Sequence, residues 1–214
     1  MIPIMIGGGM ASAVVGLIAA PQLARFSDHP SRWLDRRLVA AVSAAAGGCA
    51  AAFAAGPVDM ITFVLLAVGC GWLALVDLAT YRLPDLLVGP LYLVALAGLG
   101  WNVITAGDPG RLLVAAIIGA GVLAGYFILG LITGRLGLGD VKLAGLIGLM
   151  LGWAGPSQTA LGALGGFGVG AVMATALLIF RRAGRKSDFP FGPSMIIGAA
   201  LGLAFGPVVF PALG

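Results

Sequence analysis

The stretch that decides the fold is Met60-Ile-Thr-Phe-Val-Leu-Leu-Ala-Val-Gly-Cys-Gly-Trp-Leu-Ala-Leu-Val-Asp77, an apolar run that closes on a carboxylate. A run of about 20 apolar residues is long enough to cross a bilayer as a helix. An ionised carboxylate at membrane depth costs about 2.5–3.5 kcal/mol on insertion scales, so such residues usually line a cavity and serve chemistry or transport. The stretch therefore predicts a membrane-spanning helix with a functional aspartate at its end.

The rest of the chain repeats this pattern. Of 214 residues, 60% are hydrophobic and only 9% are charged, and a water-soluble domain of this size would lack the polar residues to cover itself. We predict an all-α fold, a polytopic membrane helix bundle in which residues 1–214 form one transmembrane domain without a soluble appendage. The long, non-alternating runs exclude a β-barrel. Eight spans are expected: Pro3–Leu23, Leu38–Ala55, Met60–Val76, Leu86–Thr105, Leu112–Thr133, Val141–Gly155, Ala160–Phe180 and Met195–Pro211.

Basic residues give the orientation. If the eight spans alternate, all but one of the 12 Lys and Arg residues fall on the same side, which the positive-inside rule assigns to the cytoplasm. Arg111 is left on the other side, and both termini lie outside. The net charge of +4 thus reports topology, and we expect no nucleic-acid partner. The residues on the basic side are Arg25, Arg32, Arg36, Arg37, Arg82, Arg135, Lys142, Arg181, Arg182, Arg185 and Lys186.

A second aspartate shares the predicted face and depth of the first. Asp140, in Gly137-Leu-Gly-Asp-Val-Lys142, starts the sixth span at the cytoplasmic side, where the third span ends at Asp77. Two carboxyls close enough to share a proton can activate a water for peptide hydrolysis, one as base and one as acid. Each aspartate alone also has an ordinary explanation. Asp140 could be a helix N-cap, and Asp77 an interfacial carboxylate or a partner of Arg82.

Residues near the aspartates suit a site at helix ends. Pro84 disfavours helical geometry at the preceding residue and should end the helix after Asp77. Gly137 and Gly139 allow a tight turn and leave room for an extended substrate. Lys142 could stabilise the ionised form of Asp140, or it could be an interfacial lysine that extends toward water.

We predict no metal and no cofactor. Cys49 and Cys70 both fall inside apolar runs, where small buried hydrophobes are the expected use of cysteine. The chain has no Cys-x-x-Cys pair, and its single histidine leaves too few zinc ligands. Small residues spaced four apart are expected to let helices approach closely. They are Gly121 with Gly125, Gly148 with Gly152, Gly162 with Gly166 and Gly170, and Gly198 with Gly202 and Gly206.

Three motifs in this order resemble the type IV prepilin peptidase family, membrane aspartic proteases of the GxGD type. The resemblance covers about residues 73–203. The motifs are Ala74-Leu-Val-Asp-Leu-Ala-Thr-Tyr-Arg-Leu-Pro-Asp85, Gly137-Leu-Gly-Asp-Val-Lys-Leu-Ala144 and Phe189-Pro-Phe-Gly-Pro193. The resemblance implies that Asp77 and Asp140 are catalytic. It also implies that the protein removes short basic leaders from type IV pilin-like precursors at the cytoplasmic face of the inner membrane.

The resemblance gives neighbouring residues further roles. Lys142 could meet the glutamate that prepilins carry near the cleavage site, and Asp85 and Asp188 could attract the basic leader or be ordinary loop carboxylates. Pro190, Gly192 and Pro193 could shape a lip over the site, or the prolines could simply start a helix. Longer family members have a cysteine-rich cytoplasmic domain linked to N-methylation. Here the corresponding region, residues 24–37, has no cysteine, so this is a short form without that domain.

Other functions fit part of the sequence. A proton- or cation-coupled transporter could use the same acidic pair, but it should continue polar residues across the membrane and show repeat symmetry. A non-catalytic assembly protein of a secretion system would keep the fold and the aspartates without activity. A presenilin-like GxGD protease would place its aspartates on adjacent spans and carry a late Pro-Ala-Leu element. In this chain two further spans separate the aspartates, and Pro211-Ala-Leu lies past the last predicted span.

Overall fold

The structure is a computed structural model that describes residues 2–52, 54, 56–134, 136–179 and 190–213. Within these ranges every regular element is helical, which confirms the predicted all-α class. The contacts divide the chain into two compact units, Met1–Ala106 and Gly107–Gly214. The prediction of a single domain stays a prediction. The eight α-helices are α1 Ile2–Leu23, α2 Arg36–Ala52, α3 Pro57–Thr80, α4 Asp85–Ala106, α5 Pro109–Thr133, α6 Leu138–Ala154, α7 Pro156–Ile179 and α8 Gly192–Val209.

The helices match the eight predicted segments one to one. Six of them are long and apolar enough to cross a membrane: α1, α3, α4, α5, α7 and α8. The other two, α2 and α6, have 17 residues each, about 25 Å of helix. The largest boundary differences are at the start of α7, which begins at Pro156 instead of Ala160, and at the end of α3. Helix α3 continues to Thr80 and so encloses Asp77. A carboxylate ends an apolar run, but it does not interrupt backbone hydrogen bonding.

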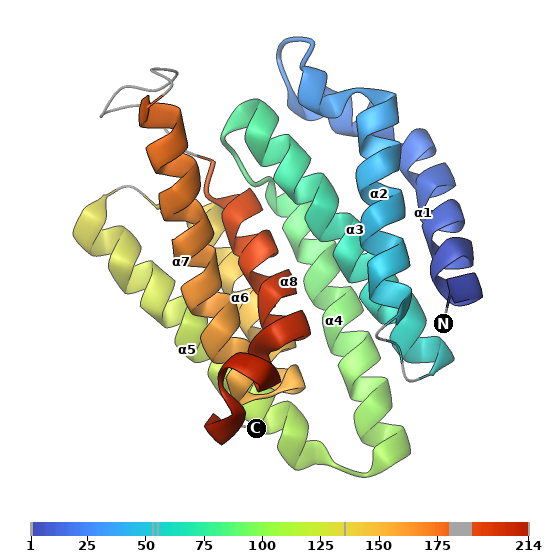
Figure 1. Ribbon diagram of the computed structural model, residues 1–214, viewed down its shortest axis with the longest axis vertical. Helices are drawn as coiled ribbons and strands as arrows, with labels where there is room; N and C mark the ends of the chain where they lie inside the picture. Colours follow the sequence, from blue (N-terminus) through green and yellow to red (C-terminus); the bar gives the residue numbers. More distant parts are fainter. Residues whose placement is uncertain (1, 53, 55, 135, 180–189, 214) are drawn as a thin grey trace. The chain divides into compact units, whose positions relative to one another are not determined.

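The four helices of the first unit form consecutive antiparallel neighbours (Figure 1). The α1–α2 and α3–α4 connections therefore lie at one end of this unit, and the α2–α3 connection lies at the other. Short 3₁₀ turns, Ala24–Phe26 and Arg32–Leu34, fill the first of these connections. A buried cluster packs beneath it, made of Ala20, Leu23, Leu34, Val39, Leu75 and Val76. Two members of this cluster, Leu75 and Val76, directly precede Asp77 in α3.

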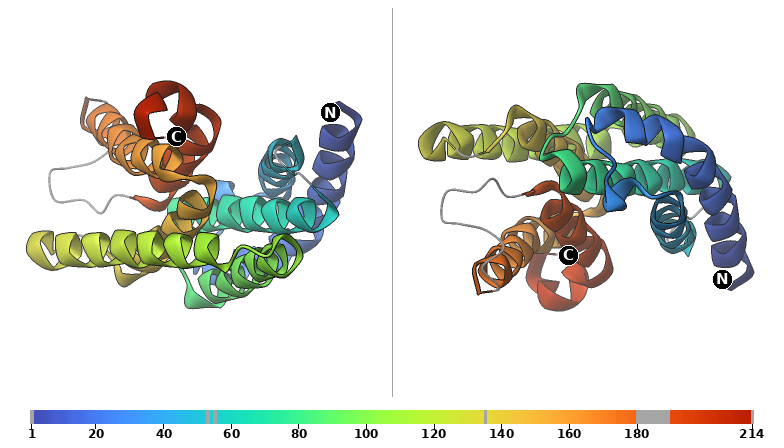
Figure 2. Two further views of the ribbon diagram at one scale, coloured as in Figure 1. Left: turned by 90° about the horizontal axis from the view of Figure 1, so that it is seen from below. Right: turned by 90° about the horizontal axis from the view of Figure 1, so that it is seen from above.

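The second unit consists of two closely packed helix pairs, α5 with α6 and α7 with α8. Figure 2 shows α7 and α8 side by side in both views. Their contact is made by glycine: a Cβ built on Gly206 would lie 2.6 Å from Cα of Gln158, and one on Gly198 would meet the backbone of Gly166. This confirms the close approach predicted for these small residues, because no side chain separates the two backbones.

The prediction for small residues fails in α5. Cβ atoms built on Gly121 and Gly125 would meet no heavy atom within 4 Å, whereas one on Gly119 would lie 3.0 Å from the backbone nitrogen of Leu149. Spacing alone could not show which face of α5 packs against α6. On α6 the predicted pair does contact α5, since built Cβ atoms on Gly148 and Gly152 would lie 2.8 and 2.9 Å from side-chain atoms there.

Candidate functional site

Asp77 lies in the last turn of α3 and is only 3% exposed. Among the residues that the structure describes, it is the one charged side chain in the buried class. Its backbone carbonyl accepts a hydrogen bond from the Tyr81 amide at 2.8 Å, and Thr80 Oγ1 donates to the Val76 carbonyl at 2.9 Å. The polar backbone at this helix end is thus partly satisfied locally. A buried carboxylate in this position is costly to maintain and indicates a use.

The turn after Asp77 is made by Tyr81, which caps α3 in the left-handed conformation at φ 55°. This is uncommon for a residue with a Cβ. Pro84 lies three residues later and begins the next element, because its carbonyl accepts hydrogen bonds from the amides of Leu87 and Val88 at 3.0 and 3.2 Å. The prediction that this segment ends the helix is confirmed, although α3 stops before the proline. Exposed Asp85 opens α4 at the same end of the unit.

Asp140 lies in the first turn of α6, as its third residue, and is half-buried. The ordinary explanation made it an N-cap, but the N-cap is Gly137. Asp140 reaches back to that residue: Oδ2 accepts a hydrogen bond from the Gly137 amide at 3.0 Å. A carboxylate here also interacts favourably with the positive end of the helix dipole. The sequence thus builds α6 so that this carboxyl is held at the helix start.

The glycines before Asp140 have ordinary backbone angles. Gly137 is extended at φ −73° and Gly139 is helical, so the tight turn expected of them is instead made by Gly134 at φ 63°. Gly134 caps α5, and its amide donates to the Gly130 carbonyl at 2.8 Å. Lys142 is exposed. Lys142 lies two residues beyond Asp140 in α6, and residues two apart on a helix lie on different faces.

The residues of the last motif start α8 at the end of the second unit where α6 also begins. Phe191 is the N-cap, and its carbonyl accepts hydrogen bonds from Ser194 Oγ at 2.7 Å and the Met195 amide at 3.2 Å. Pro193 lies in the first turn, which confirms that the motif starts a helix. Pro190, Gly192 and Pro193 are all buried. Phe189, the motif's first residue, and Asp188 lie outside the described residues.

An aromatic cluster near this end was missed by sequence reasoning. Tyr126 of α5 stacks on Phe167 of α7 with ring centroids 5.3 Å apart, and Phe191 completes the group at 6.3 and 5.8 Å from them. Gly170 leaves space for Phe191, because a Cβ there would lie 2.8 Å from the ring. A signal was present: tyrosine in an apolar span carries a polar group that needs an explanation.

The described basic residues of the first unit gather at one helix end, and those of the second unit lie one at each end. In the first unit Arg25, Arg32, Arg36, Arg37 and Arg82 all lie at or near the end that carries Asp77. In the second, Arg111 lies at the opposite end from Asp140. Its guanidinium donates to the Trp153 carbonyl at 3.0 and 3.1 Å and stacks over the Trp153 ring at 4.4 Å. Arg111, the one basic residue predicted on the non-cytoplasmic side, therefore links the start of α5 to the end of α6 through Trp153.

The two aspartates belong to different units, and their convergence stays a prediction. Over the described part of the chain, no three His, Cys, Asp or Glu side chains gather in a way that could hold a metal ion. Asp77 and Asp140 have in common a helix-end position and reduced exposure. Each unit presents its aspartate where the chain leaves or enters a helix.

Comparisons with known proteins connect these positions to a family. The model of the type IV leader peptidase family matches residues 64–180, which include both aspartates. Similar curated proteins are each named prepilin leader peptidase/N-methyltransferase. The protein of Aeromonas salmonicida (strain A449) is 34% identical over 157 residues, covering 69% of this chain and 48% of that protein. The protein of Burkholderia pseudomallei (strain 1026b) is 32% identical over 184 residues, covering 81% and 55%.

A third relative, from Pseudomonas aeruginosa, is 30% identical over 156 residues, covering 71% of this chain and 50% of that protein. The chain spans about half the length of the curated relatives it matches. No solved structure matches it. The family model covers more than half of the 214 residues, and its match contains the first two of the three motifs. The chain belongs to the type IV leader peptidase family.

Proposed function

We propose that this chain is a membrane aspartic endopeptidase that removes short basic leader peptides from type IV pilin-like precursors. The observation that carries the proposal is that the family match contains Asp77, the buried carboxylate of the first unit, together with Asp140. The names of the relatives supply the substrate class, prepilin leaders. Their second activity, N-methylation, is not part of the proposal, because the region expected to carry it has no counterpart in residues 24–37.

In the proposed mechanism, the carboxyls of Asp77 and Asp140 converge and hold one proton between them. Two carboxylates at that distance cannot both ionise, so one acts as base and the other as acid. The base takes a proton from a water, whose oxygen attacks the scissile carbonyl carbon. The acid donates its proton toward the carbonyl oxygen, and the tetrahedral intermediate then breaks its C–N bond as the leaving nitrogen is protonated. The pair titrates as a unit.

The surroundings of each aspartate support this chemistry. Burial of Asp77 in an apolar helix bundle keeps bulk water away, which strengthens electrostatic interactions in the site. The hydrogen bond from the Gly137 amide orients the Asp140 carboxyl at 3.0 Å and leaves it on the first turn of α6. Fixed orientation of both carboxyls would lower the cost of bringing them to a substrate bond.

The charge pattern supports a site at the cytoplasmic face. Of the first unit's basic residues, all five lie at or near the helix end that carries Asp77, and the positive-inside rule favours the cytoplasm for such an end. The described basic residues of the second unit are Lys142, in the first turn of α6, and Arg111, at the other end. Exposed Asp85 would supply negative charge for a basic leader beside Asp77. Lys142 is proposed to meet an acidic residue of the precursor.

The proposal is tested by co-expression with a candidate precursor that has a short basic leader. Wild type, Asp77→Asn and Asp140→Asn are compared, and Asp28→Asn is the matched control because this exposed aspartate lies in the α1–α2 connection. Precursor and mature protein are separated by electrophoresis, and the new N-terminus is sequenced. Processing by wild type and Asp28→Asn alone is expected. Equal processing by all four proteins would refute the aspartate mechanism.

A further inference from the structure

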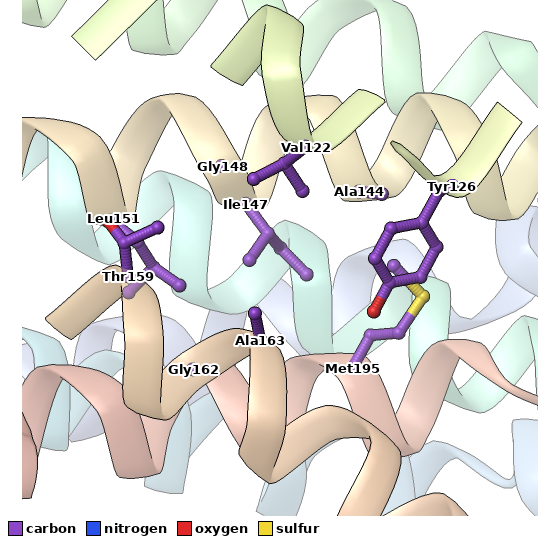
Figure 3. A pocket seen from close by; sticks show the side chains of 10 residues that line it. All are labelled: Val122, Tyr126, Ala144, Ile147, Gly148, Leu151, Thr159, Gly162, Ala163 and Met195. Atoms are coloured by element: carbon purple, nitrogen blue, oxygen red, sulfur yellow. The ribbon is translucent and has the colours of Figure 1, made fainter. Parts of the chain in front are cut away.

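The interior of the second unit offers little room for a ligand. The cavity among α5, α6, α7 and α8 measures about 10 Å³, room for roughly one water-sized sphere, and its lining is mostly apolar. Figure 3 shows Tyr126 and Met195 at one end of this cavity and Leu151 and Thr159 at the other. A partner larger than a water molecule does not fit there, whereas the exposed residues that connect α1 and α2 can receive one.

The connection between α1 and α2 carries an excess of positive charge. Residues 24–37 contain four arginines and only two aspartates. All four arginine side chains are exposed, and together they make up the arginine cluster, which consists of Arg25, Arg32, Arg36 and Arg37. Figure 1 shows the connection at the end of the first unit where α3 also ends. The arginine cluster therefore belongs to the end of the unit that carries Asp77.

The connection is folded, so the arginine cluster is displayed on an ordered support. Leu34, in the second of its 3₁₀ turns, is only 6% exposed and belongs to the buried cluster that includes Leu75 and Val76 of α3. Ser31 Oγ accepts a hydrogen bond from the Trp33 amide at 3.3 Å. An ordered binding surface loses less conformational entropy when a partner binds than a flexible segment does.

The aspartates of the connection do not balance this charge. Asp35 directs one carboxylate oxygen to the backbone, since Oδ1 accepts a hydrogen bond from the Arg37 amide at 2.9 Å at the start of α2. Arg36 and Arg37 lie in the first turn of α2, which contains no acidic side chain. The helix dipole places positive charge at this end, so two further cations are unfavourable there unless an anion binds nearby. The arrangement therefore favours an anionic partner.

The position of the arginine cluster relative to the spans puts it at the level of lipid headgroups. Helix α1 and the 3₁₀ turn after it form an apolar segment, Ile2–Phe26, that is long enough to cross a bilayer. Arg25 is the second-last residue of this segment, and Arg36 begins the next helix. Between them in the sequence, the guanidinium of Arg32 stacks over the half-buried ring of Trp33 at 4.9 Å. Tryptophan is enriched at membrane–water interfaces, and arginine on their cytoplasmic side.

We propose that the arginine cluster binds the headgroups of anionic phospholipids. The planar guanidinium group donates two parallel hydrogen bonds to a phosphate, a geometry that lysine lacks. Each basic residue at a membrane surface strengthens binding to an anionic bilayer about fivefold. Zwitterionic lipids have the same phosphate but no net charge, so charge complementarity selects the anionic lipids. Bound headgroups would hold the helix end that carries Asp77 at the depth of the lipid phosphates.

The test measures how tightly the whole purified chain binds single lipids, by native mass spectrometry. Dioleoyl-phosphatidylglycerol and dioleoyl-phosphatidylcholine have identical acyl chains and differ in headgroup charge, and glycerol 3-phosphate presents the phosphate without acyl chains. Charge is removed in Arg36→Gln and in the double variant Arg36→Gln/Arg37→Gln, and it is kept in Arg36→Lys/Arg37→Lys. Arg111→Gln is the matched control, because it removes one charge from the other unit, at the start of α5.

Wild type is expected to bind phosphatidylglycerol more than about 30-fold more tightly than phosphatidylcholine. Arg36→Gln should weaken phosphatidylglycerol binding about fivefold and the double glutamine variant about 25-fold, and the double lysine variant should fall between wild type and the double glutamine variant. Arg111→Gln should bind as wild type does. An unchanged affinity in the double glutamine variant would overturn the proposal, and displacement of the lipid by an equal concentration of glycerol 3-phosphate would assign the arginine cluster to a soluble anion instead. The unfolding of each cluster variant, followed by tryptophan fluorescence, should match that of wild type because the arginine side chains are exposed.

Discussion

The glycine contact between α7 and α8 allows a stability prediction from distances. A Cβ added at Gly202 would lie 2.5 Å from the Gln158 carbonyl oxygen and 2.8 Å from both N and Cα of Gly162. All three atoms are backbone, so no side chain can rotate away. Ordinary carbon contacts are about 3.5 Å, so α7 and α8 must separate by roughly 0.7–1 Å, which forfeits a quarter to a half of the attraction at each contact.

Gly202→Ala is therefore expected to destabilise the protein by about 2–3 kcal/mol, the upper part of the range for overpacking. The matched control is Gly121→Ala on α5, where a built Cβ meets nothing within 4 Å. This change should be neutral or stabilising by up to about 1 kcal/mol, because alanine is the better helix former. Both variants differ from wild type by one methyl group in a helix.

The assay is titration of the purified protein from dodecylmaltoside into sodium dodecyl sulfate micelles, followed by the fluorescence of its four tryptophans. A fall of 2–3 kcal/mol corresponds to about a 30- to 150-fold change in the folding equilibrium constant. The transition of Gly202→Ala should move to lower detergent fraction, and that of Gly121→Ala should not. Equal midpoints for the two variants would show that the α7–α8 backbones are not in direct contact.

Three further predictions concern the site and its supports. Precursor processing should continue in EDTA, because the proposed reaction uses the carboxyls of Asp77 and Asp140 and a water; loss of processing that zinc restores would contradict this. Arg111→Ala should lower the free energy of unfolding by about 1 kcal/mol in the same titration, because the hydrogen bonds to the Trp153 carbonyl are lost. An unchanged midpoint would show that these hydrogen bonds do not form. Tyr81→Gly should raise the free energy of unfolding by about 1 kcal/mol, because glycine adopts the left-handed cap conformation without steric strain. A decrease in the same titration would contradict this.

Much of the fold could be predicted because bilayer length and hydropathy act on each segment separately. The eight apolar runs became eight helices, and their turns contain the Gly and Pro residues that punctuate the sequence. Helix ends were harder to predict, because an apolar run stops at a charged residue whereas a helix can continue through it. The extension of α3 past Asp77 is the clearest case, because the aspartate predicted at the helix end lies within the last turn and is buried there.

The helix-end positions of the proposed site residues were predictable from the sequence, and their local structure was less so. Motif spacing identified Asp77, Asp140 and the Pro190–Pro193 segment, which lie at helix ends as expected. It could not show that Asp140 caps its own helix through Gly137, or that Gly134 makes the turn, because both depend on the exact first residue of α6. For the aromatic cluster the sequence contained one signal, a tyrosine in an apolar span, but not the partners of that tyrosine. Its members come from three separate elements, and no local pattern relates them.

The glycine contact also has a mechanical meaning. Two helices whose backbones touch along several turns cannot slide or tilt independently, so α7 and α8 move as one rigid pair. The Pro190–Pro193 segment leads into this rigid pair at the start of α8, and Gly155, at φ 142°, connects α6 to α7. Any displacement of this segment by an arriving polypeptide must then carry both helices together and be absorbed at such a joint. A pair of spin labels on α7 and α8 would keep a constant separation throughout that movement.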